Sequence, residues 1–454
     1  MKQISQESAG AEKVPFSVKL GYGIGDIGSN FFIVVTGFFL LYFLTDIVGV
    51  EPALAGMVLL LPKLWDVISD PIMGVISDRT RSRWGRRRIY LLYGALPLGF
   101  TFFLIFLAPG YESELARALH VGLMFALGCT AFTVVNVPYS SMVAEMSDDY
   151  NERISITSFR MIFACVGVLL AGALAMPLVS IGGDGATGFR FMGLILGGAI
   201  ALITLICFWS TGKAIALPRT DTIPPLKEQL QIALKNYPFM MLMAGYALQS
   251  VGIGVLMAGL IYYIMHVMKL PEAAMSVVLP ILFVTAIVFI PIWVKVGAKL
   301  GKIKAYRIGL LILTVMLISI FFTTSAQVLL FYVQVFLLGI GFSSFQLFPF
   351  SMLPDTIEYD QMKSGMRREG IFSGVWTSGQ KLAYSVGPSI VGFALSLSGF
   401  TQGDVQPESV ELGIRIVFCL FPAFTLLLSF FPFARYDLTE ERFKEIKRII
   451  AGER

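Results

Sequence analysis

The chain has 454 residues, of which 56% are hydrophobic and only 14% are charged, and its mean hydropathy is +0.76. A soluble globular protein has about 25% charged residues, so this composition leaves too little polar surface to cover the apolar mass. It excludes a soluble globular protein and predicts an all-α membrane protein. The formal net charge is +5. We expect the lipid bilayer, and no nucleic acid, as the large partner of the chain.

Apolar blocks of about 20 residues have the length that crosses a bilayer as a helix. They predict twelve spans, in chain order near 17–46, 53–77, 89–108, 118–146, 154–180, 190–211, 238–268, 274–294, 306–325, 327–353, 370–398 and 412–434. The longest polar interruption contains three prolines and divides the spans six and six. We therefore predict a six-helix bundle over 1–211, a cytoplasmic middle loop over 212–237, a second six-helix bundle over 238–435 and a cytoplasmic tail over 436–454.

The basic residues predict the orientation of the chain. If alternate loops lie on opposite sides, most Lys and Arg residues fall on the side that holds both termini, including the arginine-rich loop 79–88. The positive-inside rule makes this side the cytoplasm. We predict a multi-pass protein of the inner or plasma membrane with both termini cytoplasmic. The sequence has no G-x-x-x-x-G-K-[ST] loop, which argues against an ATP-driven pump.

The two halves carry a weak internal repeat. The second predicted span leads through Pro71-Ile72 to the run G-R-R-R-I-Y at 85–90. The eighth leads through Pro291-Ile292 to the run G-K-I-K-A-Y at 301–306. Parallel repeats of this kind are typical of secondary transporters that rock around a site near the bilayer midplane.

Several charged residues lie inside the predicted spans. A charge at the bilayer centre costs about 2.5–3.5 kcal/mol on insertion scales, so each needs a partner or a wet cavity. Lys63, Asp66 and Asp70 share one face of the second span, at spacings of three and four residues. Two carboxylates one turn apart repel each other and suit a monovalent cation or a shared proton. We favour a coupling-cation site over a structural ion pair of Lys63 with Asp66, because that pair leaves Asp70 unexplained.

Other polar side chains project into apolar spans. For Asn30, Thr133 and Asn136, hydrogen bonding between helices and contact with a ligand are comparable interpretations. Arg160 and Lys381 are cations with no acid in their own spans. We therefore interpret these two as contacts to a ligand.

Further motifs extend over nearly the whole chain. The densest is W-D-x-x-x-D-P-I-M-G, which begins at Trp65. The others are Y-G-I-G-D at 22–26 with Asn30, N-V-P-Y at 136–139, M-L-P-D at 352–355 with E-Y at 358–359, and R-E-G at 368–370 ahead of Lys381. With these motifs the sequence resembles the glycoside–pentoside–hexuronide:cation symporters, the melibiose-permease branch of the major facilitator superfamily.

The resemblance implies a major facilitator fold, with twelve transmembrane helices in two pseudo-symmetric six-helix bundles. It implies a secondary active symporter that imports a sugar-like solute with Na⁺, Li⁺ or H⁺ by alternating access, without a cofactor. The cation site that it implies consists of Asp66, Asp70 and Thr133, and we expect no other metal. The implied solute site consists of Arg160, Thr377 and Lys381, with Asn30 and Asn136 in place of two acids of the melibiose transporter.

The charge balance leads to a prediction about the solute. Inside the spans, Lys63, Arg160 and Lys381 outnumber the two aspartates of the second span. A bound coupling ion would add one more positive charge. We therefore predict an anionic solute such as a hexuronide, held by Arg160 in a bidentate geometry and by Lys381 as a point charge.

The cytoplasmic loops are predicted to latch the outward-facing state through salt bridges. The latch residues are Asp78, Arg79, Arg86, Asp355 and Glu358. We expect a monomer, because the two bundles already provide the moving interface.

Two other functions remain open from the sequence. One is a cation-coupled carrier of lysophospholipids or other amphiphiles, since lipid-handling relatives share the paired aspartates and the lysine. The other is a membrane-embedded enzyme or a receptor. The internal repeat has no role in such an enzyme, and a receptor would usually carry a signalling domain, so we expect no enzymatic activity.

Overall fold

A computed structural model describes residues 14–147, 150–213, 226–365, 368–403, 406–438 and 440–451, and these residues form helices without any strand. The first half contains α1 (Phe16–Tyr42), α2 (Pro52–Arg79), α3 (Arg88–Ile105), α4 (Glu114–Ser141), α5 (Val143–Met146), α6 (Tyr150–Ile181) and α7 (Gly185–Ser210). The second half contains α9 (Tyr237–Tyr262), α10 (Met275–Leu300), α11 (Lys302–Phe321), α12 (Val328–Ser364), α13 (Glu369–Ser398), α14 (Glu408–Arg415) and α15 (Phe421–Ala434). Short π-helical turns extend α1 and α9 and join α14 to α15, at Phe43–Ile47, Tyr263–Val267 and Ile416–Leu420.

Within the described ranges, eleven helices are long and apolar enough to cross a membrane. The predicted span 370–398 forms α13, a helix of 30 residues that is long enough to cross. Its composition is less apolar than that of the others because serines, glycines and Lys381 replace hydrophobic residues. The helix tolerates these polar residues because it packs along α2 and α9 in the middle of the molecule, where protein surrounds it.

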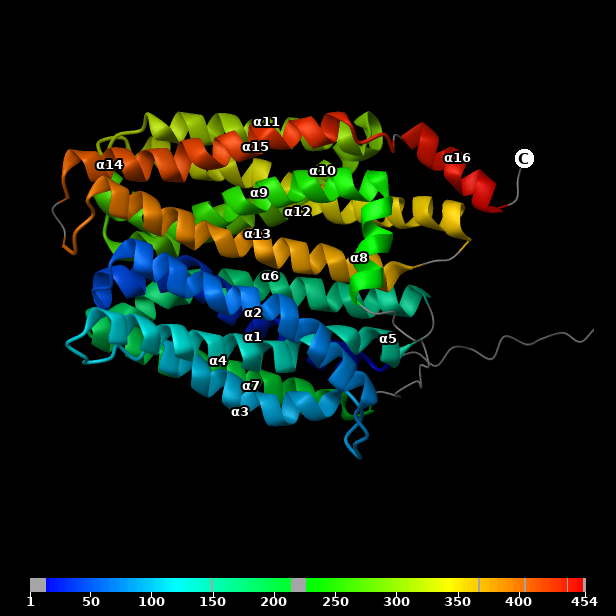
Figure 1. Cartoon of the computed structure of the whole chain (residues 1–454), viewed down its shortest axis with the longest axis horizontal. Helices are drawn as coiled ribbons and strands as arrows, with labels where there is room; N and C mark the ends of the chain where they lie inside the picture. The colour runs from blue at the N-terminus through cyan, green and yellow to red at the C-terminus, as the bar shows by residue number, and fades with distance from the viewer. Residues whose placement is uncertain are drawn as a thin grey trace, which may run out of the picture.

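The helices form two bundles that lie side by side (Figure 1). Helices of the first half occupy one side of the view and helices of the second half the other. The bundles meet where α2 packs on α13, α6 on α10 and α1 on α9. Glycines permit the closest approaches, because a Cβ added at Gly392 of α13 would lie 2.2 Å from the carbonyl oxygen of Pro52 on α2. This arrangement agrees with the predicted fold of two helical bundles.

Among the described residues, the short helices α5, α8 and α16 lie outside the membrane-spanning set. The predicted middle loop contains a helix, α8 (Leu226–Lys235), in its second half. This helix is short and packs on α9 and α13, which explains why span-length hydropathy missed it. In the tail, α16 (Glu440–Ala451) packs on the end of α12. The remainder of the middle loop, 214–225, lies outside the described residues.

The bundles contact each other directly at the end of the molecule where α1 and α9 finish. The Tyr42 hydroxyl donates to Glu272 Oε1 at 2.5 Å, and the hydroxyls of Thr45 and Tyr262 are 2.6 Å apart. Each contact joins one bundle to the other. The two bundles are therefore held together at this end of the molecule.

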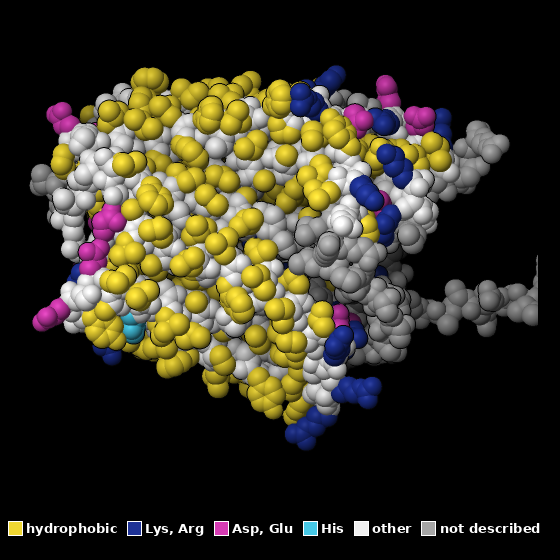
Figure 2. Space-filling view, viewed as in Figure 1, with side chains coloured by type: hydrophobic (Ala, Val, Ile, Leu, Met, Phe, Trp, Pro, Cys, Tyr) yellow, Lys and Arg dark blue, Asp and Glu magenta, His cyan; other side chains and the backbone are white. Residues whose placement is uncertain are grey.

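The surface has the distribution of polarity that a bilayer requires. In Figure 2, hydrophobic side chains cover the middle of the visible face, and most Lys and Arg side chains gather at the end that carries α16. An apolar belt with one strongly basic end is expected of a membrane protein that obeys the positive-inside rule.

Candidate functional site

The charged face of α2 lies at mid-helix, toward the other bundle. Lys63 Nζ lies 3.5 Å from Asp66 Oδ2. The Asp66 side chain is buried, with a relative exposure of 2% for the residue, and its Oδ1 atom has no hydrogen-bond partner. A buried carboxylate oxygen without a donor is costly, so this atom is a candidate ligand for an added cation or proton.

Asp70 connects three helices. The Thr133 hydroxyl of α4 donates to Asp70 Oδ1 at 2.8 Å. The Lys381 ammonium of α13 forms an ion pair with Asp70 Oδ2. Because α2 and α13 belong to different bundles, this ion pair links the two bundles directly. The structure therefore places Asp66, Asp70, Thr133 and Lys381 in one cluster.

Lys63 has aromatic as well as acidic neighbours. Its ammonium lies 5.1 Å from the ring centroid of Phe125 and 5.7 Å from that of Phe32. Aromatic faces stabilise a cation in apolar surroundings. Lys63 is therefore held as a charged group even though its contact to Asp66 is long.

A cavity of about 460 Å³ lies between the bundles beside this cluster. Among the predicted site residues, its wall includes Asn30, Lys63, Asp66, Thr377 and Lys381. Its wall also includes five polar residues that were not predicted, Thr36, Gln346, Gln380, Tyr384 and Ser385. Their polarity within predicted spans is the feature of the sequence that indicates them.

Arg160 requires a correction. It was interpreted as a ligand contact because its own span contains no acid, but its Nε donates to Asp26 Oδ2 of α1 at 2.6 Å and its Nη2 to Asp26 Oδ1 at 3.4 Å. Arg160 also stacks on the Tyr139 ring, 5.1 Å from the centroid. Its side chain lies outside the wall of the cavity. When Asp26 is included, three cations face three carboxylates, and the predicted excess of positive charge is absent before an ion binds.

The neutral candidates have different environments. The Asn30 amide lines the cavity but donates to the backbone oxygen of Asp26 on its own helix at 2.8 Å. The Thr377 hydroxyl also lines the cavity and donates to the Ser373 carbonyl at 2.9 Å. Asn136 is partly buried and lies outside the cavity wall. Of the two asparagines, Asn30 is the better placed to contact a solute.

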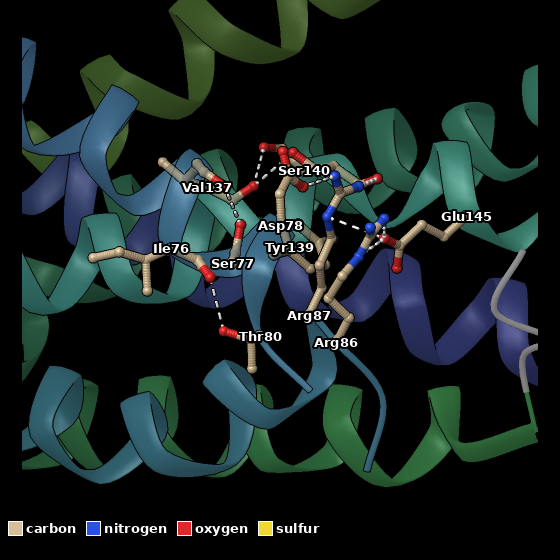
Figure 3. Close-up of polar contacts among 12 residues, drawn as sticks. Ile76, Ser77, Asp78, Thr80, Arg86, Arg87, Val137, Tyr139, Ser140 and Glu145 are labelled. Carbon is tan, nitrogen blue, oxygen red and sulfur yellow. Dashed lines mark hydrogen bonds and ion pairs between the residues drawn. The ribbon is translucent and has the colours of Figure 1, made fainter. Parts of the chain in front are cut away.

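The predicted latch residues of the first bundle form a local network (Figure 3). Arg87 donates to Asp78 Oδ1 at 2.6 Å, and Arg86 Nε donates to Glu145 Oε1 at 2.9 Å. Arg87 also approaches Glu145 at 3.2 Å. Arg79 is exposed beside this network. Arg87 and Glu145 were not among the predicted latch residues. Their ion pairs depend on how the loop folds back on the end of α4, which the sequence does not show.

The latch residues of the second bundle also pair within their own bundle. Lys302 forms an ion pair with Asp355 at 2.7 Å, and Arg368 forms one with Asp360 at 3.0 Å. The Glu358 Oε2 atom is buried without a hydrogen-bond partner. A latch between the bundles therefore stays a prediction for another conformation, in which these pairs would exchange partners.

The site contains too few acidic ligands for a conventional metal centre. Across the described ranges, no group of three or more His, Cys, Asp or Glu side chains is placed to hold a metal ion. A cation at Asp66 and Asp70 would need neutral oxygens such as the Thr133 hydroxyl to complete its coordination. Such a site suits a monovalent ion or a proton better than a tightly bound divalent ion.

Comparison with known families covers most of the chain. Residues 21–440 match the family described as MFS/sugar transport protein. The inner membrane symporter YicJ of Escherichia coli is 27% identical over 453 residues, which cover 97% of this chain and 96% of the relative. The glucuronide carrier protein homolog of the same organism is 28% identical over 429 residues, with 94% and 93% covered. The sodium-dependent lysophosphatidylcholine symporter 1 of Xenopus tropicalis is 24% identical over 485 residues, with 98% and 92% covered.

Solved structures share the fold. A bacterial homolog of the human lysosomal transporter Spinster, crystallised in an inward-facing and unoccupied conformation, aligns with a TM-score of 0.68. The alignment covers 96% of this chain and 97% of that one, at 14% sequence identity. At this identity the likeness concerns the fold alone.

Proposed function

Because the chain belongs to the MFS/sugar transport protein family, we propose that it is a secondary active symporter that imports a sugar-like solute with Na⁺ or H⁺. The solute that we favour is an anionic sugar such as a hexuronide. The chain is a multi-pass membrane transporter and not an enzyme. The observation that carries the proposal is the cluster in which Asp70 is shared by Thr133 and Lys381 beside a buried Asp66 oxygen that has no partner.

The coupling ion binds at Asp66, Asp70 and Thr133 in this proposal. These residues offer two carboxylates and one hydroxyl, and Asp66 Oδ1 is free to accept. A Na⁺ ion that enters the cluster competes with the Lys381 ammonium for Asp70 Oδ2. Protonation of Asp70 would also weaken its attraction for Lys381, so the same cluster serves either ion.

Release of Lys381 then couples the ion to the solute. Lys381 lines the cavity, so its charge becomes available to an anion once Asp70 is neutralised. The three cations and three carboxylates balance without an ion, and the bound ion adds one positive charge. Ion and solute therefore bind cooperatively, and by linkage the solute also strengthens ion binding.

The conformation fits this cycle. We place the basic end of the molecule, with both termini, in the cytoplasm. The contacts of Tyr42 with Glu272 and of Thr45 with Tyr262 then close the outer side, so the chain is inward-facing. In the outward-facing state we expect Asp78, Arg86, Asp355 and other latch residues to join the bundles at the cytoplasmic end. The transporter works as a monomer, because the moving interface lies within one chain.

One alternative has support of its own. The wall of the cavity is predominantly apolar, which also suits a lysophospholipid or another amphiphile. The similarity to a sodium-dependent lysophosphatidylcholine symporter favours the same alternative. In that case the ion site would be the same and the solute would differ.

Uptake by proteoliposomes tests the proposal. Labelled glucuronate is supplied with an inward Na⁺ gradient at constant pH, with an inward H⁺ gradient in the absence of Na⁺, or with no gradient. We expect one gradient to drive accumulation above equilibrium, and Asp66→Asn to abolish it. Asp184→Asn is the matched control, because Asp184 lies at the start of α7, outside the site. Failure of both gradients to drive uptake of glucuronate or of substituted glucuronides would contradict the proposal.

A further inference from the structure

Tyr246 of α9 is fixed by aromatic neighbours from two other helices. Its ring stacks on that of Trp376 of α13, with the centroids 4.4 Å apart, and on that of Phe345 of α12, with the centroids 5.2 Å apart. Phe350 of α12 meets the same ring edge-on, at 6.0 Å. Because Tyr246 is also fully buried, packing prevents the ring from turning and sets the position of its hydroxyl.

The Tyr246 hydroxyl in turn holds the side chain of Gln380. Gln380 Nε2 donates a hydrogen bond to this hydroxyl at 2.6 Å. Trp376 and Gln380 share one face of α13, because they lie four positions apart on the helix. This face therefore contacts both the ring and the hydroxyl of Tyr246. The Gln380 amide has one defined orientation, although it belongs to a long side chain.

The other end of this amide is available to the cavity. Gln380 is half-buried and lines the cavity, whereas Tyr246 lies behind the wall. Within the described part of the chain, Gln380 Oε1 accepts no hydrogen bond, and it is not one of the fully buried polar atoms without a partner. Because Nε2 points toward Tyr246, the amide oxygen is the group that remains for a ligand.

A solute held by lysines also needs a hydrogen-bond acceptor. The ammonium groups of Lys63 and Lys381 only donate, and the proposed coupling ion occupies Asp66 and Asp70. A solute hydroxyl that donates its proton therefore requires another oxygen in the wall. Gln380 Oε1 supplies such an oxygen in the same wall as the two lysines.

From this geometry we propose that Gln380 determines specificity by accepting a hydrogen bond from one solute hydroxyl, and that Tyr246 positions it. This inference rests on the proposed symport of a sugar-like solute. A solute with hydrogen in place of this hydroxyl leaves Gln380 Oε1 without a donor, and a solute with only an acceptor there places two acceptors against each other. A site built to hydrogen-bond a hydroxyl rejects analogues that lack it.

Competition binding tests this role independently of transport. Wild-type protein in lipid nanodiscs, at saturating Na⁺ or at low pH, binds labelled glucuronate, and its deoxy and deoxyfluoro analogues at each ring hydroxyl compete for the site. We expect the deoxy analogue at one position to bind about tenfold more weakly than glucuronate, which is the size of one hydrogen bond. The deoxyfluoro analogue at this position should bind no better, because fluorine does not donate. Recovery of full affinity by the fluorine would overturn the orientation of the amide.

Two variants and their combination test the two residues. In Gln380→Leu we expect the discrimination at this position to disappear, while discrimination at the other hydroxyls remains. Tyr246→Phe keeps the aromatic stack but releases the amide, so discrimination at the same position should fall about threefold. The double variant should behave as Gln380→Leu does, because Tyr246 acts only through Gln380. Unchanged discrimination in Gln380→Leu would overturn the proposal, and a further loss in the double variant would overturn the positioning role of Tyr246.

Tyr263→Phe is the matched control. Tyr263 is also buried and stacked, with its ring centroid 4.7 Å from that of Phe418, but its hydroxyl donates to the Ile320 carbonyl and it does not line the cavity. We expect wild-type discrimination in this variant. The same loss in Tyr263→Phe as in Tyr246→Phe would show a general effect of a missing buried hydroxyl and would overturn the positioning role.

The same measurements separate this inference from the proposed function. Binding of a neutral phenyl glucoside but not of glucuronate would contradict the anionic solute alone, and the deoxyglucosides then replace the glucuronate analogues in the comparison. Binding with the expected discrimination but without gradient-driven uptake would contradict only the symport. Gradient-driven uptake of a solute whose deoxy analogues all bind equally well would overturn this inference alone. Binding of neither solute would contradict both.

Discussion

Two acid–base pairs in the interior of the molecule contain similar charges but are built differently. Asp26 and Arg160 both belong to the first bundle, and two guanidinium nitrogens hold the carboxylate. Asp70 and Lys381 belong to different bundles, and a single ammonium holds one carboxylate oxygen. Only the second pair has another carboxylate beside it with a partnerless buried oxygen, that of Asp66.

This difference shows which of the two ion pairs a coupling ion can break. A planar guanidinium that is bidentate to a carboxylate and stacked on Tyr139 is difficult to replace by a small ion, and its opening would not move one bundle against the other. A lysine ammonium is a point charge on a flexible stem, and a monovalent cation can take its place. A charge inside a span is therefore insufficient to identify the coupling site. The connection between bundles identifies it.

The largest expected effect comes from Asp70→Asn. An amide at this position does not hold Lys381 as a salt bridge and does not attract a cation, so ion and solute become uncoupled. We expect gradient-driven accumulation to fall to the level of empty liposomes, while counterflow of unlabelled against labelled solute remains. Both are measured in the same proteoliposomes, with Asp184→Asn as the control. Accumulation equal to that of the wild type would show that Asp70 is not a coupling residue.

The next effect concerns stability and tests the pair within one bundle. Asp26→Asn leaves the Arg160 guanidinium buried without its counter-charge, and breaking a buried pair in this way costs about 3–5 kcal/mol. We expect a large loss of thermal stability, measured by tryptophan fluorescence of the purified protein. The double variant Asp26→Leu, Arg160→Met should recover most of it, because both charges are removed. If the single variant were as stable as the wild type, the two pairs would not differ as described.

The sequence predicts the two carboxylates of the proposed ion site much better than it predicts either ion pair. Asp66 and Asp70 are four residues apart on one helix, so the period of the helix is sufficient to place them on one face. Arg160 and Asp26 are 134 positions apart, and their pairing depends on the packing of α1 against α6. The sequence indicates this pair only by placing an acid, Asp26, in one predicted span and a cation, Arg160, in another. The ion pair of Lys381 with Asp70 depends on contact between the bundles, which hydropathy does not report.

The fold follows from the sequence more completely than the site does. Apolar blocks locate the long helices, because each must satisfy its backbone hydrogen bonds inside the bilayer. Even α13, whose polar residues dilute its hydropathy, is long enough to be recognised. The short helix α8 was missed because a helix of 10 residues leaves no span-length signal. The sequence also does not predict how far the cavity between the bundles extends, because this depends on which faces of the surrounding helices meet.

A smaller effect is expected from Lys381→Gln. This variant tests whether Lys381 and the coupling ion compete for the Asp70 carboxylate. Without the ammonium, Asp70 is free for the ion, so Na⁺ affinity should rise about tenfold, equivalent to about 1.4 kcal/mol. Binding of glucuronate should weaken in the same variant, because its counter-charge is lost. Both constants are obtained from fluorescence titration in nanodiscs, with Lys299→Gln at the exposed end of α10 as the control. Reduced Na⁺ affinity would contradict competition at Asp70.

The smallest effect is expected from Thr133→Val, which removes one neutral oxygen from the cluster. The hydroxyl donates to Asp70 without the ion and faces the ion when it is bound, so its removal affects both states and the losses partly cancel. We expect Na⁺ binding to weaken about threefold, within the range of one hydrogen bond. Thr204→Val is the matched control, because Thr204 is buried in the same bundle and bonds only to the Ile200 carbonyl of its own helix. Equal titrations of the two variants would show that Thr133 positions Asp70 without contacting the ion, and the site would then consist of the two carboxylates and backbone oxygens.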